Sequence, residues 1–191
     1  MKTFIALAAG LAMVPCAAFA QDNDNAKLSG VRAEARIGYE TPTVSDSTGI
    51  YKIGSAVSYG GEIGFDLKVG SKVQVGPYAA YEFSSVKLCD TGACIKEDGN
   101  LAVGGRIGVA VSPKAVIYGK VGYTRITFSA NAGVLSGSDS KDGVQGAIGV
   151  DYNINRNVYL MIEANYGDYG SLGGGVNLAR RQLAGGVGFR F

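Results

Sequence analysis

The stretch VRAEARIGYE, residues 31–40, alternates between apolar side chains and charged or small ones. Its apolar members share one face of an extended chain: Val31, Ala33, Ala35, Ile37 and Tyr39. The opposite face carries ions and one glycine: Arg32, Glu34, Arg36, Gly38 and Glu40. Successive side chains of a β-strand point to opposite faces, and a register slip of one residue would reverse this sorting. The stretch therefore predicts a strand with one apolar and one charged face.

The same alternation recurs in eight segments, at residues 31–40, 56–69, 73–84, 99–111, 115–128, 143–153, 158–167 and 179–191. Most are longer than the five to six residues typical of globular strands, and a tilted strand needs about nine to eleven to cross a bilayer. Short connections (70–72, 112–114 and 154–157) separate long ones (41–55, 85–98, 129–142 and 168–178). Short turns on one side and long loops on the other are typical of bacterial outer-membrane barrels. We predict an all-β, eight-stranded antiparallel transmembrane β-barrel with short periplasmic turns and long extracellular loops.

The composition fits a single β domain. The 191 residues are 47% hydrophobic and 18% charged, which excludes disorder, and they include 30 glycines and 11 tyrosines. A formal net charge of +2 gives no reason to expect nucleic-acid binding.

The first twenty residues have the layout of a secretory signal. A basic residue at Lys2 precedes an apolar run, and the segment ends in Ala18-Phe19-Ala20. We expect cleavage before Gln21, a flexible periplasmic lead-in at 21–30 and a barrel at 31–191. Lipidation of Cys16 is the alternative, although the preceding Pro15 fits it poorly.

The polar faces of the eight segments mix glycines with ions of both signs. The interior of an eight-stranded barrel is just wide enough for side chains to fill. We therefore expect an ionic cluster in the lumen, formed by Arg32, Arg36, Glu62, Asp66, Glu82, Arg106, Lys120 and Glu163. Other ions on the same faces are Glu34, Asp151, Arg180 and Arg190.

Aromatic residues stand toward the ends of the apolar faces. Tyr39, Tyr81, Tyr123 and Tyr166 are near the predicted loops, whereas Tyr152 is near a turn. Amphipathic rings favour the headgroup level of a membrane, so these tyrosines predict two girdles around the barrel. A secreted soluble barrel of the lipocalin type, with the rings in its core, is the alternative.

Two cysteines of the mature chain, Cys89 and Cys94, lie close together in the segment CDTGAC. In an exported protein such a pair predicts a disulfide, and two free thiols are the alternative. The chain has no histidine, so neither a zinc site nor a histidine-based active site is expected. A carboxylate pair among Glu62, Asp66, Glu82 and Glu163 could in principle share acid and base roles, but neutralisation of arginines is the simpler role. We predict no enzyme activity, no cofactor and no metal.

The mature length of about 170 residues, the eight segments, VIYGKVGYTRI at 116–126 and GGVGFRF at 185–191 resemble the opacity-type, porin-like outer-membrane barrels of Gram-negative bacteria. The resemblance implies an outer-membrane location, contact with membrane lipid, and recognition of the aromatic C-terminal strand, with Phe189 and Phe191, by the barrel-assembly machinery. It also implies loops that act in adhesion to a host or surface ligand, or a role in envelope integrity. A small-solute channel is the alternative, although wide lumens belong to barrels of about sixteen to eighteen strands.

Overall fold

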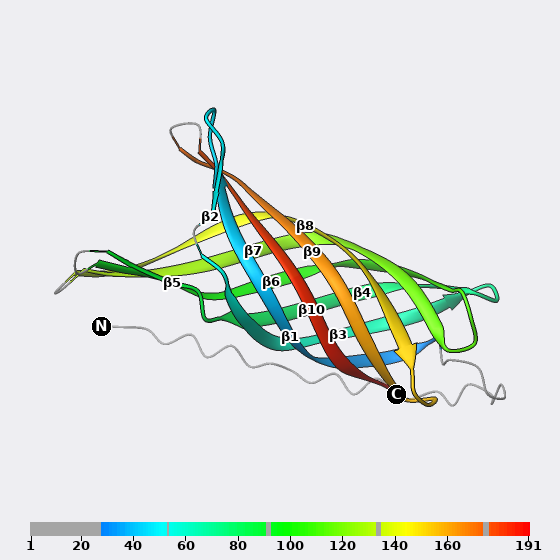
Figure 1. Cartoon of the computed structure of the whole chain (residues 1–191). Helices are drawn as coiled ribbons and strands as arrows, with labels where there is room; N and C mark the ends of the chain where they lie inside the picture. The colour runs from blue at the N-terminus through cyan, green and yellow to red at the C-terminus, as the bar shows by residue number, and fades with distance from the viewer. Residues whose placement is uncertain (1–27, 53, 91–92, 133–134, 174–175) are drawn as a thin grey trace, which may run out of the picture.

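A computed structural model describes residues 28–52, 54–90, 93–132, 135–173 and 176–191 (Figure 1). The expected signal segment and most of the lead-in lie outside these residues. The strands are β1 (Gly30–Ser45), β2 (Ile50–Lys52), β3 (Ala56–Val69), β4 (Val73–Ser84), β5 (Lys87–Asp90), β6 (Ala93–Ala110), β7 (Ala115–Ala132), β8 (Leu135–Asn153), β9 (Val158–Gly173) and β10 (Val176–Arg190).

Eight long strands form a closed antiparallel barrel in the order β1, β3, β4, β6, β7, β8, β9, β10. The ring closes where β1 pairs with β10, from Arg32 opposite Arg190 to Ser45 opposite Asn177. The short strands β2 and β5 add to β1 and β6 in hairpins at one end of the barrel. The predicted fold class is therefore confirmed. In the described part of the chain, no helix has the length and hydropathy needed to cross a membrane.

The strands reach further toward the extracellular end than the alternation indicates. β7 and β8 stay paired until Ala132 meets Leu135, so most of the loop expected at 129–142 is a two-stranded ribbon. β9 and β10 likewise occupy most of 168–178. The boundaries expected there were wrong, because ladder hydrogen bonds continue through residues that have no apolar face. Polar cross-strand contacts support the ribbon, as between the hydroxyls of Thr127 and Ser140, 3.0 Å apart.

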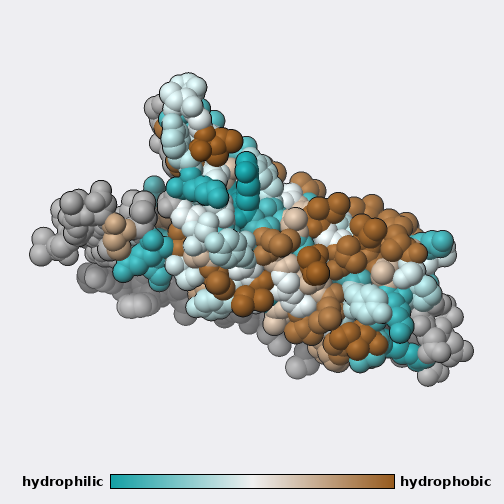
Figure 2. Space-filling view, viewed as in Figure 1, coloured by the Kyte–Doolittle hydropathy of each residue, from teal (hydrophilic) through white to brown (hydrophobic). Residues whose placement is uncertain are grey.

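The barrel wall is apolar outside and charged inside. Large aliphatic side chains such as Ile63 and Ile162, each 65% exposed, point outward, whereas Arg32 is fully buried. Figure 2 shows hydrophobic residues spread over the barrel wall and hydrophilic ones more common toward the protruding hairpins. This distribution is the reverse of that in a soluble protein, whose charged residues are rarely buried.

Glycines on the inner wall make room for large side chains. Gly104 and Gly122 face each other across the β6–β7 ladder, and a Cβ added at Gly104 would overlap the carbonyl of Val121. A Cβ added at Gly188 would overlap the ring of Tyr159. The small and large residues of adjacent strands are therefore complementary in shape.

Candidate functional site

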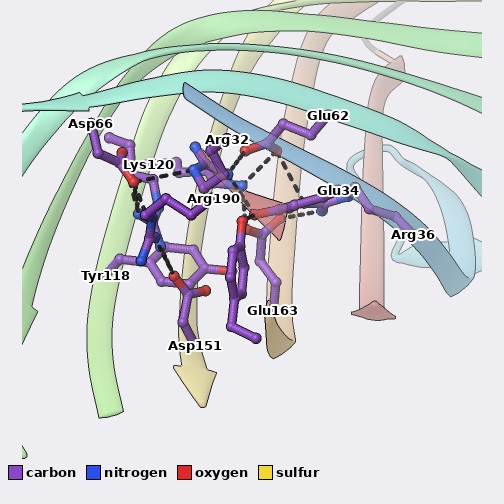
Figure 3. Close-up of polar contacts among 12 residues, drawn as sticks. Arg32, Glu34, Arg36, Glu62, Asp66, Tyr118, Lys120, Asp151, Glu163 and Arg190 are labelled. Atoms are coloured by element: carbon purple, nitrogen blue, oxygen red, sulfur yellow. Dashed lines mark hydrogen bonds and ion pairs between the residues drawn. The ribbon is translucent and has the colours of Figure 1, made fainter. Parts of the chain in front are cut away.

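The centre of the lumen is organised by Arg36 from β1, which contacts four carboxylates. Figure 3 labels three of them, Glu34, Glu62 and Glu163. Its Nη1 lies 3.1 Å from Glu34 and 3.0 Å from Glu62, and its Nε lies 3.1 Å from Glu82. Its Nη2 pairs with Glu163 of β9. These acids come from β1, β3, β4 and β9, so one guanidinium connects four strands.

Lys120 reaches the same acids from β7. Its Nζ lies 2.6 Å from Glu62 and 2.5 Å from Glu163, and all three side chains are almost fully buried. The Tyr118 hydroxyl donates to the same Glu163 oxygen, Oε2, at 2.8 Å. The central cluster, defined as Glu34, Arg36, Glu62, Lys120 and Glu163, therefore spans the interior.

A second group, the turn-side cluster, is formed by Arg32, Asp66, Arg106, Asp151 and Arg190. Asp66 forms ion pairs with three guanidiniums. Its Oδ2 lies 3.3 Å from Arg32, 3.2 Å from Arg106 and 3.1 Å from Arg190. Asp151 pairs with Arg106 at 2.6 Å and with Arg190 at 3.3 Å. Two carboxylates shared by three guanidiniums hold β1, β3, β6, β8 and β10 together near the turns.

A third group, the loop-side cluster, surrounds Arg180 of β10. The Nε of Arg180 donates to Glu40 at 2.6 Å and its Nη2 donates to Glu82 at 2.9 Å. Glu97 is the third acid, with Oε1 3.8 Å from Arg180 Nε. It is buried, yet neither of its carboxylate oxygens accepts a hydrogen bond from the described residues.

Glu97 lies beyond the outward apolar run of β6, which begins at Leu101. Burial, together with the neighbouring carboxylates of Glu40 and Glu82, raises the pKa of Glu97 to about 8, although Arg180 opposes the rise. The loop-side cluster therefore contains a carboxyl that keeps its proton to a higher pH than an ordinary glutamate does.

Side-chain amides separate the loop-side cluster from the central one on part of the wall. Asn100 donates to Gln145 at 3.4 Å, Gln145 to Asn165 at 3.1 Å, and Asn165 to Gln182 at 3.0 Å. Gln182 continues the chain to Glu82 at 2.7 Å. The amides thus join four strands, β6, β8, β9 and β10, by a continuous chain of hydrogen bonds.

An apolar cluster lies at the loop end of the lumen. Ile126, Tyr169 and Leu178 are buried there, and Val44 and Phe128 pack against them. An apolar layer above buried ions limits their access to water.

The buried ions of the described residues are six bases and eight acids. They are Arg32, Arg36, Arg106, Lys120, Arg180 and Arg190, with Glu34, Glu40, Glu62, Asp66, Glu82, Glu97, Asp151 and Glu163. The lumen therefore carries an excess of two acids when all are ionised. No group of three His, Cys, Asp or Glu among these described residues is placed to hold a metal ion.

All eight residues expected in the lumen cluster lie inside the barrel, and each forms an ion pair. Sequence reasoning missed Glu97, because it assigned residue 97 to the loop expected at 85–98, whereas β6 begins at Ala93 and a register shift between Glu97 and Gly99 breaks the alternation there. It also missed inward Tyr118 and Tyr159. Tyr118 shares the parity of Lys120, two residues later, which was a usable signal.

The five tyrosines expected in girdles all point outward and are exposed: Tyr39, Tyr81, Tyr123, Tyr152 and Tyr166. Phe189 and Phe191 are outward too, with ring centroids 4.8 Å apart. Cys89 of β5 lies directly opposite Cys94 of β6.

Comparison with known proteins agrees with the architecture. Residues 4–191 match the model of the outer membrane protein beta-barrel domain, and the chain belongs to this family. The family indicates the bacterial outer membrane as the location of the protein.

Solved structures show the same fold. Neisserial surface protein A is 14% identical and has a TM-score of 0.60, with 83% of this chain and 97% of that chain covered. Ail of Yersinia pestis, in complex with the heparin analogue sucrose octasulfate, is 18% identical with a TM-score of 0.56 and coverage of 85% and 99%. OprG of Pseudomonas aeruginosa is 14% identical with a TM-score of 0.54 and coverage of 89% and 99%. A search of curated protein sequences gave no significant match.

Proposed function

We propose that the protein is a non-enzymatic surface barrel of the outer membrane. Its wall contacts lipid, its lumen is filled by ion pairs, and its extracellular hairpins act in adhesion, other surface interaction or envelope integrity. The observation that carries the proposal is the network of buried ion pairs between facing walls, centred on Arg36 and Lys120.

The filled lumen argues against the alternative, a channel for small solutes. Opening a path would require breaking pairs such as Lys120 with Glu62 and separating the apolar cluster above them. Breaking a buried pair costs about 3–5 kcal/mol. In planar bilayers the purified protein should give no large, steady openings, whereas a sixteen-stranded porin inserted under the same conditions should. Steady conductance at the level of that porin would support the channel instead.

The lipid-facing wall is supported by the outward aliphatic and aromatic side chains. Tyr39 and Tyr166 stand near the loop end of the apolar band, and Tyr152 and Phe189 near the turn end, as two girdles require. A soluble barrel would need these exposed side chains to be covered by protein. The mature chain should therefore aggregate without detergent or lipid, and a monodisperse sample in plain buffer would refute the orientation.

The hairpins at the loop end are the surface offered to partners. Lys87 and Lys96 are exposed on β5 and β6. Because a barrel of the same fold has been crystallised with a sulfated heparin analogue, an anionic glycan is a suitable first ligand to test. Cells that display the protein should bind immobilised heparin, and Lys87→Ala with Lys96→Ala should reduce binding, whereas Lys68→Ala near the turns should not.

Equal heparin binding by these variants would exclude that surface. Envelope integrity would then be measured as the detergent sensitivity of a deletion strain. A strain as resistant as its parent would exclude the second role as well.

Three further proposals rest on sequence features. A disulfide between Cys89 and Cys94 is supported by their opposed positions, because the Cα atoms of directly opposite residues lie about 4.5–5.5 Å apart, within the range of about 4.4–6.8 Å that a disulfide spans. The assembly machinery is proposed to recognise Phe189 and Phe191, which predicts less folded protein in the membranes of a Phe191→Ala strain.

Cleavage of the signal segment is proposed to occur before Gln21, so amino-terminal sequencing of the mature protein should begin at Gln21.

A further inference from the structure

Arg181 of β10 is an outward, exposed guanidinium that forms no hydrogen bond or ion pair with the described residues. Arg125, on the outer face of β7, is its natural comparison. The Nε of Arg125 lies 2.6 Å from Asp142 Oδ1, and the Tyr123 hydroxyl donates to the same carboxylate at 2.5 Å. Arg125 is thus paired with a carboxylate of the protein, whereas Arg181 is not paired with any carboxylate of the described residues.

A groove of about 430 Å³ surrounds Arg181 on the barrel surface. The register places Tyr166 of β9 on one side of Arg181 and Thr41 of β1 on the other, with Tyr39 next along β1. Leu183 and Ala164 line the part of the groove nearer the turns. Tyr166 is therefore directly opposite the cation and Tyr39 is diagonal to it, and the small side chain of Ala164 lines the same shallow, open groove.

The groove lies at the loop-side boundary of the apolar band. Toward the turns, the outward positions of β1 and β10 are apolar, beginning with Ile37 and Leu183, each 61% exposed. Toward the loops they are polar or small. A ligand in this groove would meet a cation at one end and a hydrocarbon-like surface at the other.

This amphiphilic character selects the ligand. A guanidinium fork matches the geometry of phosphate, and tyrosines favour the interface between headgroups and hydrocarbon. Asp168 is the nearest outward acid of β9 in the register; its carboxylate accepts from the backbone of Gly170 at 2.9 Å and forms no ion pair with Arg181.

We propose that Arg181, Tyr39 and Tyr166 bind the phosphate-bearing headgroup of an outer-leaflet lipid, with an acyl chain along Leu183 and Ala164. The site rests on the proposed lipid-facing orientation of the wall. It goes beyond that orientation because it predicts a phosphate-specific position on one sector of the barrel.

The test is native mass spectrometry of the full-length mature protein in detergent, titrated with diphosphorylated lipid A or with its dephosphorylated form. Arg181→Gln should weaken binding of the diphosphorylated lipid about tenfold, the scale of one charge-assisted contact. Arg125→Gln, which changes formal charge equally, should leave binding unchanged. The dephosphorylated lipid should bind all three proteins equally weakly.

Three results would overturn the site: equal losses in the two glutamine variants, no loss in either, or displacement of the lipid by millimolar inorganic phosphate alone. Displacement by inorganic phosphate would indicate a free-anion site.

Arg181→Lys and Tyr39→Ala should both bind the phosphorylated lipid less tightly than wild type. Heat-modifiable gel migration checks that each variant is folded, and failure of the lipid-facing orientation would be seen separately as solubility without detergent.

Discussion

Replacement of Arg36 by methionine should cause a large loss of barrel stability. Methionine is unbranched and keeps most of the buried volume, so the variant removes a charge rather than creating a large cavity. Arg36 contacts four carboxylates, and losing one member of a buried ion pair costs about 3–5 kcal/mol.

The cost should stay near that range rather than multiply by four. Each carboxylate left behind keeps another cation: Glu34 and Glu62 contact Arg32, and Glu163 contacts Lys120. Glu82 keeps Arg180 in the same way.

The direction of charge removal matters as well. Eight buried acids face six buried bases, so losing a base increases the excess of negative charge and losing an acid reduces it. Glu163→Gln should therefore cost less than Arg36→Met. The double variant should be more stable than the sum of the two single losses predicts, because the residues are in contact.

The assay is reversible urea unfolding in phospholipid vesicles, followed by far-UV circular dichroism. Arg125→Met, which disrupts the exposed pair with Asp142, is the control and should change stability little. The reasoning fails if Arg36→Met lies within about 1 kcal/mol of wild type, or if Glu163→Gln is the more damaging change.

Further predictions concern packing, pH and the thiols. Gly104→Ala should destabilise the barrel by about 1–3 kcal/mol in the same assay, because the added methyl has no space, whereas Gly105→Ala on the open outer face should be tolerated. The raised pKa of Glu97, about 8 against an ordinary 4.5, means that the folded protein binds a proton which the unfolded chain releases, so the stability from this group falls as pH rises from about 4.5 to about 8. Glu97→Gln should flatten that part of the pH profile, and an unchanged profile would reject the assignment. Cys89 and Cys94 should resist maleimide labelling until a reductant is added; labelling without it would indicate free thiols.

The alternation in the sequence was sufficient for the strand count and for the faces of the strands. In residues 31–40 charged and apolar side chains separate cleanly, so the face that Arg32 and Arg36 share could be read directly. Partner choice could not be read, because Arg36 meets Glu163 across 127 positions of sequence. Such contacts depend on strand tilt and register, which one sequence does not specify.

The inward tyrosines were missed for a related reason. Tyr118 fits the lumen where Gly149 stands opposite on β8, and Tyr159 fits where Gly188 stands opposite on β10. Strand parity can place such a ring on the inner wall, as Lys120 does for Tyr118, but the space for it is recognisable only when its glycine on the adjacent strand is known. The polar ribbon of β7 and β8 was missed because no apolar alternation marks it.

The pairing of β1 with β10 has a consequence for biogenesis. Residues near position 32 meet residues near position 190, so the ring cannot close before almost the whole chain has left the site of synthesis. Until then the fourteen buried ions are hydrated, and they interrupt every apolar run of the mature strands. A translocon therefore meets no apolar stretch long enough to be released sideways into the inner membrane. The acids and bases that later neutralise one another inside the barrel first keep the chain out of that membrane.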